Sequence, residues 1–333
     1  MLTYPVFKSQ LILFLVLVLS TANALAAEPP RPGRRFLVID KADQHLVWFL
    51  DGKKAARFPV SFGVDPNSDK IKVSDCATPE GRYAISYKKN PSRFHRTLGL
   101  SYPTLANAEK GLAGGVISLR EYRRISGAIQ KFRPAPHDTR LGGGIAIHGG
   151  GVFRYFGKAR ERDWTEGCVA LNDPDIEKLF DECLPGDAVI IYNSRRNLYG
   201  IIRPFTRIQN VDGMGVPVCP DGVCTYWAEL PTSLGRTVCT LREGKGRGRS
   251  LQVRVYKAAA REKPILVLVD RNADGRLSVL DSVSGPLSEK ASSDAVYKMV
   301  REAVTASLSM GRIWEPVRLR EPGFSSNIGK FIE

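Results

Sequence analysis

Residues 142–172 read GGGIAIHGGGVFRYFGKARERDWTEGCVALN, and the rest of the chain is organised around this stretch. A short apolar run ends on His148, which three glycines follow, and sixteen residues separate this histidine from Thr165. Thr165 opens the tight group Thr165-Glu166-Gly167-Cys168, after which the sequence turns apolar again. The stretch therefore presents one histidine and one cysteine, each beside glycine and a short apolar run.

The chemistry of this stretch follows from one thiol and one imidazole. A free cysteine thiol titrates near ~8.5, so only a small fraction of it is thiolate at neutral pH. A nearby imidazole can accept the thiol proton and stabilise the resulting thiolate. Cys168 and His148 are therefore candidates for a nucleophile and its general base.

Glycines flank both candidate catalytic residues. Gly167 allows a sharp backbone turn before Cys168 and places N–H groups near the sulfur, where they can stabilise the oxyanion that forms when a thiolate attacks a carbonyl. Gly149 and Gly150 keep bulk away from the imidazole, so that an extended substrate can approach. These glycines are predicted to serve the site.

These residues resemble the signature of the L,D-transpeptidase (YkuD) family of cell-wall enzymes, in which a histidine is followed, after a gap of this size, by Ser/Thr-His-Gly-Cys. Two further segments agree in order and spacing. Residues 78–83, TPEGRY, resemble the start of a strand in that family, and residues 98–103, LGLSYP, resemble a stretch in one of its branches. The resemblance covers about residues 34–194.

The resemblance implies a fold and an activity. The expected fold is α+β: a β-rich catalytic domain of mixed sheets or a sandwich with a helical insertion over residues 34–196, then a smaller α+β module over residues 204–333. The expected activity is peptidoglycan L,D-transpeptidation, in which a cysteine forms a thioester with a stem peptide and D-Ala leaves. Stem peptides are then the partners, and catalysis needs no cofactor.

The residues expected at the site divide into two groups. Thr165 either hydrogen-bonds within the turn or only shapes it, and Tyr155 and Trp164 either line a cleft or belong to an aromatic core. The expected catalytic residues are Cys168, His148 and Gly167, and the expected substrate-binding residues are Gly149, Gly150, Thr165 and Tyr155.

The sequence departs from the family pattern at two positions beside Cys168. Glu166 stands where the family usually has histidine, and Ala170 stands where it often has asparagine or arginine. His148 must then act as the base alone, unless Glu166 helps to hold the site. Three hypotheses follow: a transpeptidase, an L,D-hydrolase or carboxypeptidase on the same scaffold, and a wall-binding module without activity.

Composition and charge narrow the surroundings in which the chain acts. Its 333 residues suggest about two domains of ~150 residues, and the apolar fraction of 43% is enough for ordinary cores. The net charge of +15 favours polyanionic surroundings such as acidic envelope polymers. Basic residues are not interleaved with aromatic ones as in a nucleic-acid groove, so we expect no nucleic-acid partner.

Residues 1–26 are typical of a secretory signal peptide. Residues 11–19, LILFLVLVL, are too short to span a bilayer, and Ala24-Leu25-Ala26 fits a cleavage site. The alternative is an uncleaved N-terminal anchor. No other stretch approaches the ~20 apolar residues of a membrane helix. We therefore expect export to the periplasm or cell envelope, with no transmembrane helix in the mature chain.

The six cysteines are expected to differ in state. Export permits disulfides, but a nucleophilic Cys168 must stay reduced. A disulfide is expected among Cys219, Cys224 and Cys239, whereas no C-x-x-C or histidine spacing supports a zinc site. The sequence leaves Cys76 and Cys183 open as buried thiols or disulfide partners.

Short strands and a helical insertion are predicted for the catalytic half. Strands are expected at residues 36–40, 44–50, 56–63, 81–87 and 188–192, with a hairpin turn at Asp51-Gly52. Residues 105–132 form the expected helical insertion, in which Ser118 and Glu121 make a capping box. Another helix is expected to start at Asn172-Asp173-Pro174, with Ile176, Leu179 and Phe180 as its apolar stripe.

In the C-terminal half, the sequence predicts strands at residues 250–256 and 264–269, a flexible Gly/Arg loop at 236–249 and a helix at 292–309. One segment there carries oxygen ligands at the spacing of an EF-hand-type loop, with a glycine at the sixth position. The alternative is a polar Asx turn between two strands. The candidate ligands of a structural Ca²⁺ are Asp270, Asn272, Asp274, Ser278 and Asp281.

Overall fold

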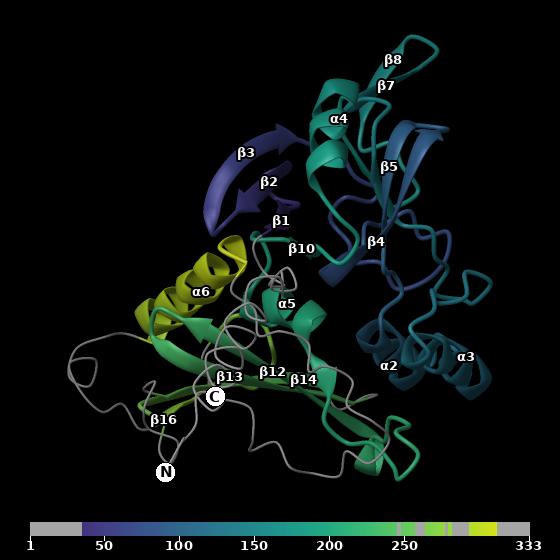
Figure 1. The fold of residues 1–333 in the computed structure, drawn as a ribbon. Coiled ribbons are helices and arrows are strands. Elements are labelled where there is room, and N and C mark those ends of the chain that lie inside the picture. The colour runs from purple at the N-terminus through teal and green to yellow at the C-terminus, as the bar shows by residue number, and fades with distance from the viewer. Residues whose placement is uncertain (1–34, 245–247, 257–263, 277–278, 282–292, 312–333) are drawn as a thin grey trace, which may run out of the picture. The chain divides into compact units, whose positions relative to one another are not determined.

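An eight-stranded mixed sheet forms the core of the N-terminal half (Figure 1). The computed structural model describes residues 35–244, 248–256, 264–276, 279–281 and 293–311, so the predicted signal peptide lies outside the described residues. The strands of the sheet are β1 Arg35–Asp40, β2 His45–Leu50, β3 Lys53–Pro59, β4 Gly81–Ser92, β5 His95–Leu100, β6 Ala146–His148, β9 Val169–Ala170 and β10 Ala188–Tyr192.

The order of the strands is β3-β2-β1-β10-β4-β5-β6-β9. The β1–β10 and β6–β9 pairs are parallel, and the other neighbouring pairs are antiparallel. Asp51 and Gly52 have φ angles of 49° and 74°, as a tight hairpin turn between β2 and β3 requires. The hairpin prediction is confirmed, although β3 begins three residues before the predicted strand and ends at Pro59.

The central strands are buried on both faces, which explains their unbroken apolar sequences. Successive side chains of a strand point to opposite faces of the sheet. In β1, Leu37 and Ile39 contribute to one hydrophobic core and Val38 contributes to another. In β10, Val189 and Ile190 divide between the two cores in the same way.

Three helices accompany this sheet, α2 Leu105–Ala113, α3 Leu119–Gln130 and α4 Asp173–Glu182. The capping box predicted at Ser118 and Glu121 is present at the start of α3. The helices α2 and α3 bury a small hydrophobic cluster of their own, with Ile125 fully buried. The helix α4 buries Ile176 and Leu179 against the core of the sheet, as its apolar stripe predicted.

A second, six-stranded sheet forms the C-terminal module, in the order β11-β12-β13-β14-β15-β16. Every neighbouring pair in it is antiparallel. The bounds are α5 Leu198–Ile202, η1 Arg203–Phe205, β11 Arg207–Ile208, η2 Pro220–Gly222, β12 Val223–Thr232, β13 Gly235–Gly244, β14 Gly248–Tyr256, β15 Leu266–Asp270, β16 Val279–Asp281 and α6 Ser293–Ser309. The predicted α+β, β-rich fold is confirmed.

The prediction of a flexible loop at residues 236–249 is wrong. Most of this segment lies in β13 and in the start of β14, which pair with each other. Thr237, Cys239 and Leu241 are buried at every second position of β13. This alternation is the signal of a half-buried strand, and the glycine and arginine content of the segment obscured it.

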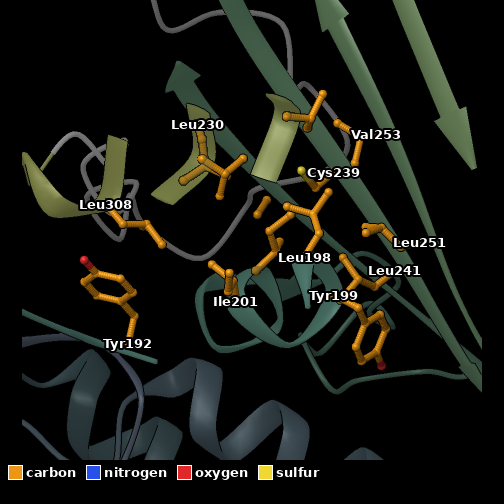
Figure 2. Close-up of a cluster of buried hydrophobic side chains, with 14 of the residues drawn as sticks. Tyr192, Leu198, Tyr199, Ile201, Leu230, Cys239, Leu241, Leu251, Val253 and Leu308 are labelled. Carbon is orange, nitrogen blue, oxygen red and sulfur yellow. The ribbon is translucent and has the colours of Figure 1, made fainter. Parts of the chain in front are cut away.

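The second core joins the C-terminal module to the eight-stranded sheet. Val38, Ile190 and Tyr192 of the first sheet belong to the same buried cluster as residues of β12, β13, β14 and α6. Figure 2 shows this cluster, with Tyr192 near Leu308 of α6 and with Leu198 and Ile201 of α5 in its interior. The C-terminal module thus buries the face of β1 and β10 that would otherwise expose apolar side chains. A domain boundary between residues 196 and 204 stays a prediction.

The structure gives no support to the calcium hypothesis. The two carboxylate oxygens of Asp270 accept backbone N–H groups of its own loop, from Asp274 at 3.2 Å and from Gly275 at 2.9 Å. The loop joins the antiparallel strands β15 and β16, so it is the Asx-type turn of the alternative hypothesis. Asn272 lies in this turn, Ser278 lies outside the described residues, and nothing is described of the Asp281 side chain. In the described part of the chain, no group of three His, Cys, Asp or Glu side chains is arranged to hold a metal ion.

Two further predictions concern disulfides and membrane helices. Cys219 and Cys224 form a disulfide, and Cys239 is a buried free thiol. Cys76, Cys168 and Cys183 are also free.

No helix within the described residues combines the length and the apolar character that crossing a membrane needs.

Candidate active site

The parallel pair β6–β9 places the histidine and the cysteine on one face of the sheet. His148 pairs with Ala170 in the register of the two strands, and Cys168 precedes that partner by two residues. The intervening residues Ile147 and Val169 point into the hydrophobic core. Because strand side chains alternate, the imidazole and the thiol both lie on the opposite face.

The imidazole of His148 is held in one orientation. Its Nδ1 lies 2.6 Å from the carbonyl oxygen of Gly149, which can only accept a hydrogen bond. Nδ1 must therefore carry the proton, which leaves Nε2 unprotonated in the neutral ring and able to act as a base. The ring stacks on Phe94 with centroids 4.4 Å apart, and Trp164 lies against it at 5.8 Å.

Burial keeps this imidazole neutral. His148 is 3% exposed, and its desolvation lowers the pKa below the ordinary value of 6.5. The positive charge of Arg154 lowers the pKa further, whereas the hydrogen bond to the Gly149 carbonyl raises it. The base is therefore unprotonated at neutral pH.

The thiol of Cys168 is also neutral in the free protein. Burial raises its pKa above the ordinary value, and the charge of Glu166 acts in the same direction. The backbone N–H of Ala146 and the charge of Lys70 lower it. Sγ lies 3.7 Å from the carbonyl oxygen of Gly144, where the S–H group can donate. A thiolate thus forms only when the proton is transferred to a base.

The turn before the cysteine is built by Thr165 and Gly167. The Thr165 hydroxyl donates to the carbonyl of Cys168 at 2.7 Å and accepts from the N–H of Gly167 at 3.1 Å. Thr165 therefore hydrogen-bonds within the turn, which was one of the two roles considered for it. Gly167 has a φ of 124°, and a Cβ atom there would lie 2.6 Å from the carbonyl oxygen of Ala77. Only glycine fits this position.

The hydrogen bonds of the turn change the assignment of the oxyanion donors. The N–H of Gly167 is already directed at the Thr165 hydroxyl. An oxyanion donor at this turn therefore stays a prediction for the N–H of Cys168, and Gly167 shapes the turn. The Glu166 side chain is exposed, and its effect on the thiol is to disfavour the charged form.

The glycines after His148 have two different surroundings. A Cβ atom at Gly149 would lie 2.5 Å from Asp173 Oδ1 and 2.9 Å from the carbonyl oxygen of Phe94, so close packing requires this glycine. Gly150 lines a cavity of about 420 Å³ together with Tyr155, which is 68% exposed on the hairpin β7 Phe153–Phe156 and β8 Ala159–Arg162. A substrate-binding role for both glycines and Tyr155 stays a prediction.

A buried ion pair lies next to the backbone that carries the cysteine turn. It gives the Thr-Pro-Glu-Gly segment, residues 78–81, a structural role. Lys41 Nζ lies 3.0 Å from Glu80 Oε1, and both side chains are completely buried. Arg196 binds the same carboxylate oxygen at 2.9 Å. The hydroxyl of Thr78 accepts the N–H of Gly63 at 3.0 Å, and a Cβ atom at Gly63 would lie 3.1 Å from the Cα of Gly167. The segment thus anchors the backbone on which the cysteine turn rests.

Sequence reasoning missed three residues that shape the site. Phe94 covers the imidazole, and Arg154 and Lys70 act on the pKa values of the histidine and the cysteine. Arg154 lies within the gap between His148 and Thr165, where a basic residue could have been considered. No local pattern marks Phe94 or Lys70, because folding brings them to the site from distant segments.

The buried imidazole of His148 and the thiol of Cys168 thus lie on one face of a mixed sheet. Residues 34–191 match the YkuD family, the L,D-transpeptidase catalytic domain. This part of the chain is therefore a YkuD L,D-transpeptidase catalytic domain. No curated protein matches the chain.

Several solved structures resemble the chain at low sequence identity. A cysteine-to-serine mutant of the Enterococcus faecium L,D-transpeptidase is 12% identical, with a TM-score of 0.29 over 49% of this chain and 51% of that one. The Mycobacterium tuberculosis L,D-transpeptidase 1 is 15% identical, with a TM-score of 0.23 over 48% and 62%. Bd1075 of Bdellovibrio bacteriovorus is 12% identical, with a TM-score of 0.31 over 70% and 91%. The chain spans about half the length of the Enterococcus faecium structure.

Proposed function

We propose that this protein is an exported peptidoglycan L,D-transpeptidase with Cys168 as nucleophile and His148 as general base. The observation that carries the proposal is the hydrogen bond from His148 Nδ1 to the Gly149 carbonyl, on the same sheet face as the thiol. This bond leaves Nε2 as the basic nitrogen. The family of the catalytic domain supplies the substrate class, the peptidoglycan stem peptide.

The first half-reaction forms a thioester. Sγ of Cys168 attacks the carbonyl of the third residue of a tetrapeptide stem, and the thiol proton passes to Nε2 of His148. The N–H of Cys168 stabilises the tetrahedral oxyanion. The C–N bond then breaks, Nε2 returns its proton to the leaving nitrogen, and D-Ala departs.

The second half-reaction transfers the acyl group. An amine of another stem peptide attacks the thioester carbonyl and gives its proton to Nε2. The C–S bond breaks, and the sulfur takes the proton back from His148. If water attacks instead, the same steps release a tripeptide, and the protein is a hydrolase.

Product analysis with a purified disaccharide-tetrapeptide tests the proposal. We expect free D-Ala together with a cross-linked dimer, separated by liquid chromatography and identified by mass. Tripeptide without dimer would show the hydrolase, and binding without any release of D-Ala would show a wall-binding module. The matched control is Cys168→Ala, which must give neither product.

The acidic limb of the pH profile is expected below pH 6.5. Acylation requires a neutral His148, whose pKa lies below its ordinary value because the ring is buried and faces Arg154. The rate is thus retained above that pKa and is lost as the pH falls through it. We expect this from the second-order rate constant of acylation by a carbapenem, measured between about pH 4.5 and 8. A midpoint clearly above 6.5 would contradict the description of the base.

A further inference from the structure

A cavity of about 420 Å³ opens beside the imidazole, and neither half-reaction described above uses it. Gly150, two residues after His148, contributes to its wall together with Phe94, the ring that stacks on the imidazole. The residues that matter for its chemistry are Arg93, Phe94, Gly150, Arg154, Tyr155 and Asp173.

Two guanidinium groups of this cavity contact aromatic rings. The Cζ atom of Arg154 lies 4.6 Å from the ring centroid of Trp164 and 5.6 Å from that of Phe94. The Cζ atom of Arg93 lies 5.3 Å from the Phe94 centroid. Neither arginine forms an ion pair with a carboxylate among the residues that the structure describes. A guanidinium that stacks by its face keeps the N–H donors of its edge available for a ligand.

The other ionisable groups of the cavity are already bound within the protein. Asp173 Oδ1 accepts the N–H of Gly150 at 2.7 Å. His95 Nε2 lies 2.7 Å from Glu177 Oε1. Within the described residues, the cationic side chains of the cavity that have no carboxylate partner are the two arginines, and an anion with two oxygens fits their paired donors.

The cavity lies on the histidine side of the reacting atoms. The thiol lies near Gly144, just before β6. The imidazole stands at the last residue of β6, and Gly150, two residues further along the chain, lines the cavity. His148 exchanges protons with the leaving amine and with the incoming amine, so both amines must stand on its side of the thioester. In D-Ala, the carbon that bears this amine also bears a carboxylate.

We propose that Arg93 and Arg154 form a subsite for the carboxylate adjacent to the reacting amine, in the leaving D-Ala and in an acceptor of the same type. This inference rests on the proposed function. The subsite holds the amine against the imidazole, and it selects against substrates whose terminal carboxylate is neutralised.

The test compares a stem tetrapeptide that ends in D-Ala with the same peptide ending in D-alaninamide. Hydrogen bonds to charged groups imply a preference of about 10- to 100-fold in kcat/KM for the free carboxylate. We expect Arg93→Gln and Arg154→Gln each to reduce this preference and the double variant to abolish it, because the contact that these changes remove is made by the carboxylate peptide and not by the amide. Assays at about pH 8 keep His148 neutral in every variant. Arg123→Gln, on the exposed surface of α3, is the matched control.

Measuring equilibrium binding tests the carboxylate preference without requiring the protein to turn the peptide over. Calorimetry on the Cys168→Ala protein should show tighter binding of the carboxylate peptide, and the added Arg93→Gln and Arg154→Gln changes should remove the difference. Equal affinities in the starting protein, or a preference that the double variant retains, would overturn the subsite. If the peptides bind with the expected preference but wild type releases no D-Ala, the proposed function fails and the subsite stands.

Discussion

Replacing Cys168 with alanine is expected to abolish covalent acylation by a carbapenem and to lower stem-peptide turnover by at least about 10⁴-fold. The sulfur is the atom that bonds to the acyl group, and alanine offers no nucleophile in its place. His148→Ala is expected to slow acylation by about 10²- to 10⁴-fold without preventing it. The thiol remains in that variant, but its raised pKa leaves little thiolate at neutral pH.

Intact-mass measurement after incubation with a carbapenem checks this prediction. Wild type should gain the mass of one inhibitor molecule, and Cys168→Ala should gain none. Cys76→Ala is the matched control, because Cys76 is also a partly exposed free thiol, and it should react like wild type. An adduct that persists in Cys168→Ala would falsify the assignment of the nucleophile.

The largest expected effect on stability is that of Glu80→Ala, which should lower the free energy of unfolding by about 3–5 kcal/mol. Lys41 and Glu80 are both completely buried, so removing the carboxylate leaves an ammonium without its ionic partner inside the protein. Arg196 loses the same partner. Because this pair anchors the backbone behind Gly63 and Gly167, acylation of Cys168 should slow in the same variant.

Urea denaturation followed by circular dichroism measures the difference. Asp138→Ala is the control, since Asp138 pairs with Arg124 on the surface at 2.7 Å, and its loss should cost less than about 1 kcal/mol. If both variants unfold at the same urea concentration, the buried pair does not carry the stability that its burial implies.

Much of the fold could be predicted because local patterns agree with it. The apolar runs of β1 and β10, the turn at Asp51-Gly52 and the capping box at Ser118 each depend on neighbouring residues alone. The segment 236–249 was wrongly predicted to be a loop because its glycines and arginines are typical of loops. The alternating burial of Thr237, Cys239 and Leu241 is instead that of a strand. The structure does not support the calcium hypothesis at Asp270, because spacing alone does not show whether a carboxylate faces a metal or, as here, the N–H groups of its own loop.

The sequence predicted which two side chains are candidates for the reaction, but it did not predict which residues surround them. The spacing of His148 and Cys168 in a known pattern was enough to propose a nucleophile and a base. Their protonation could not be predicted, because it depends on burial and on charges from distant segments. Phe94 covers the imidazole, and Arg154 and Lys70 shift the two pKa values in ways that no local motif expresses.

By itself, the sequence determined the strands β1, β2, β4, β10, β14 and β15, the principal helices and the candidate pair His148 and Cys168. The strands and helices follow short-range patterns, and the pair follows a known motif. The tertiary structure alone decided that the C-terminal module covers the second face of β1 and β10, that Lys41 and the partly exposed Arg196 meet at the buried carboxylate of Glu80, and that two arginines border a cavity beside the imidazole. The physical reason is that burial and electrostatic interaction depend on distance in space, and these groups become neighbours only when the chain has folded.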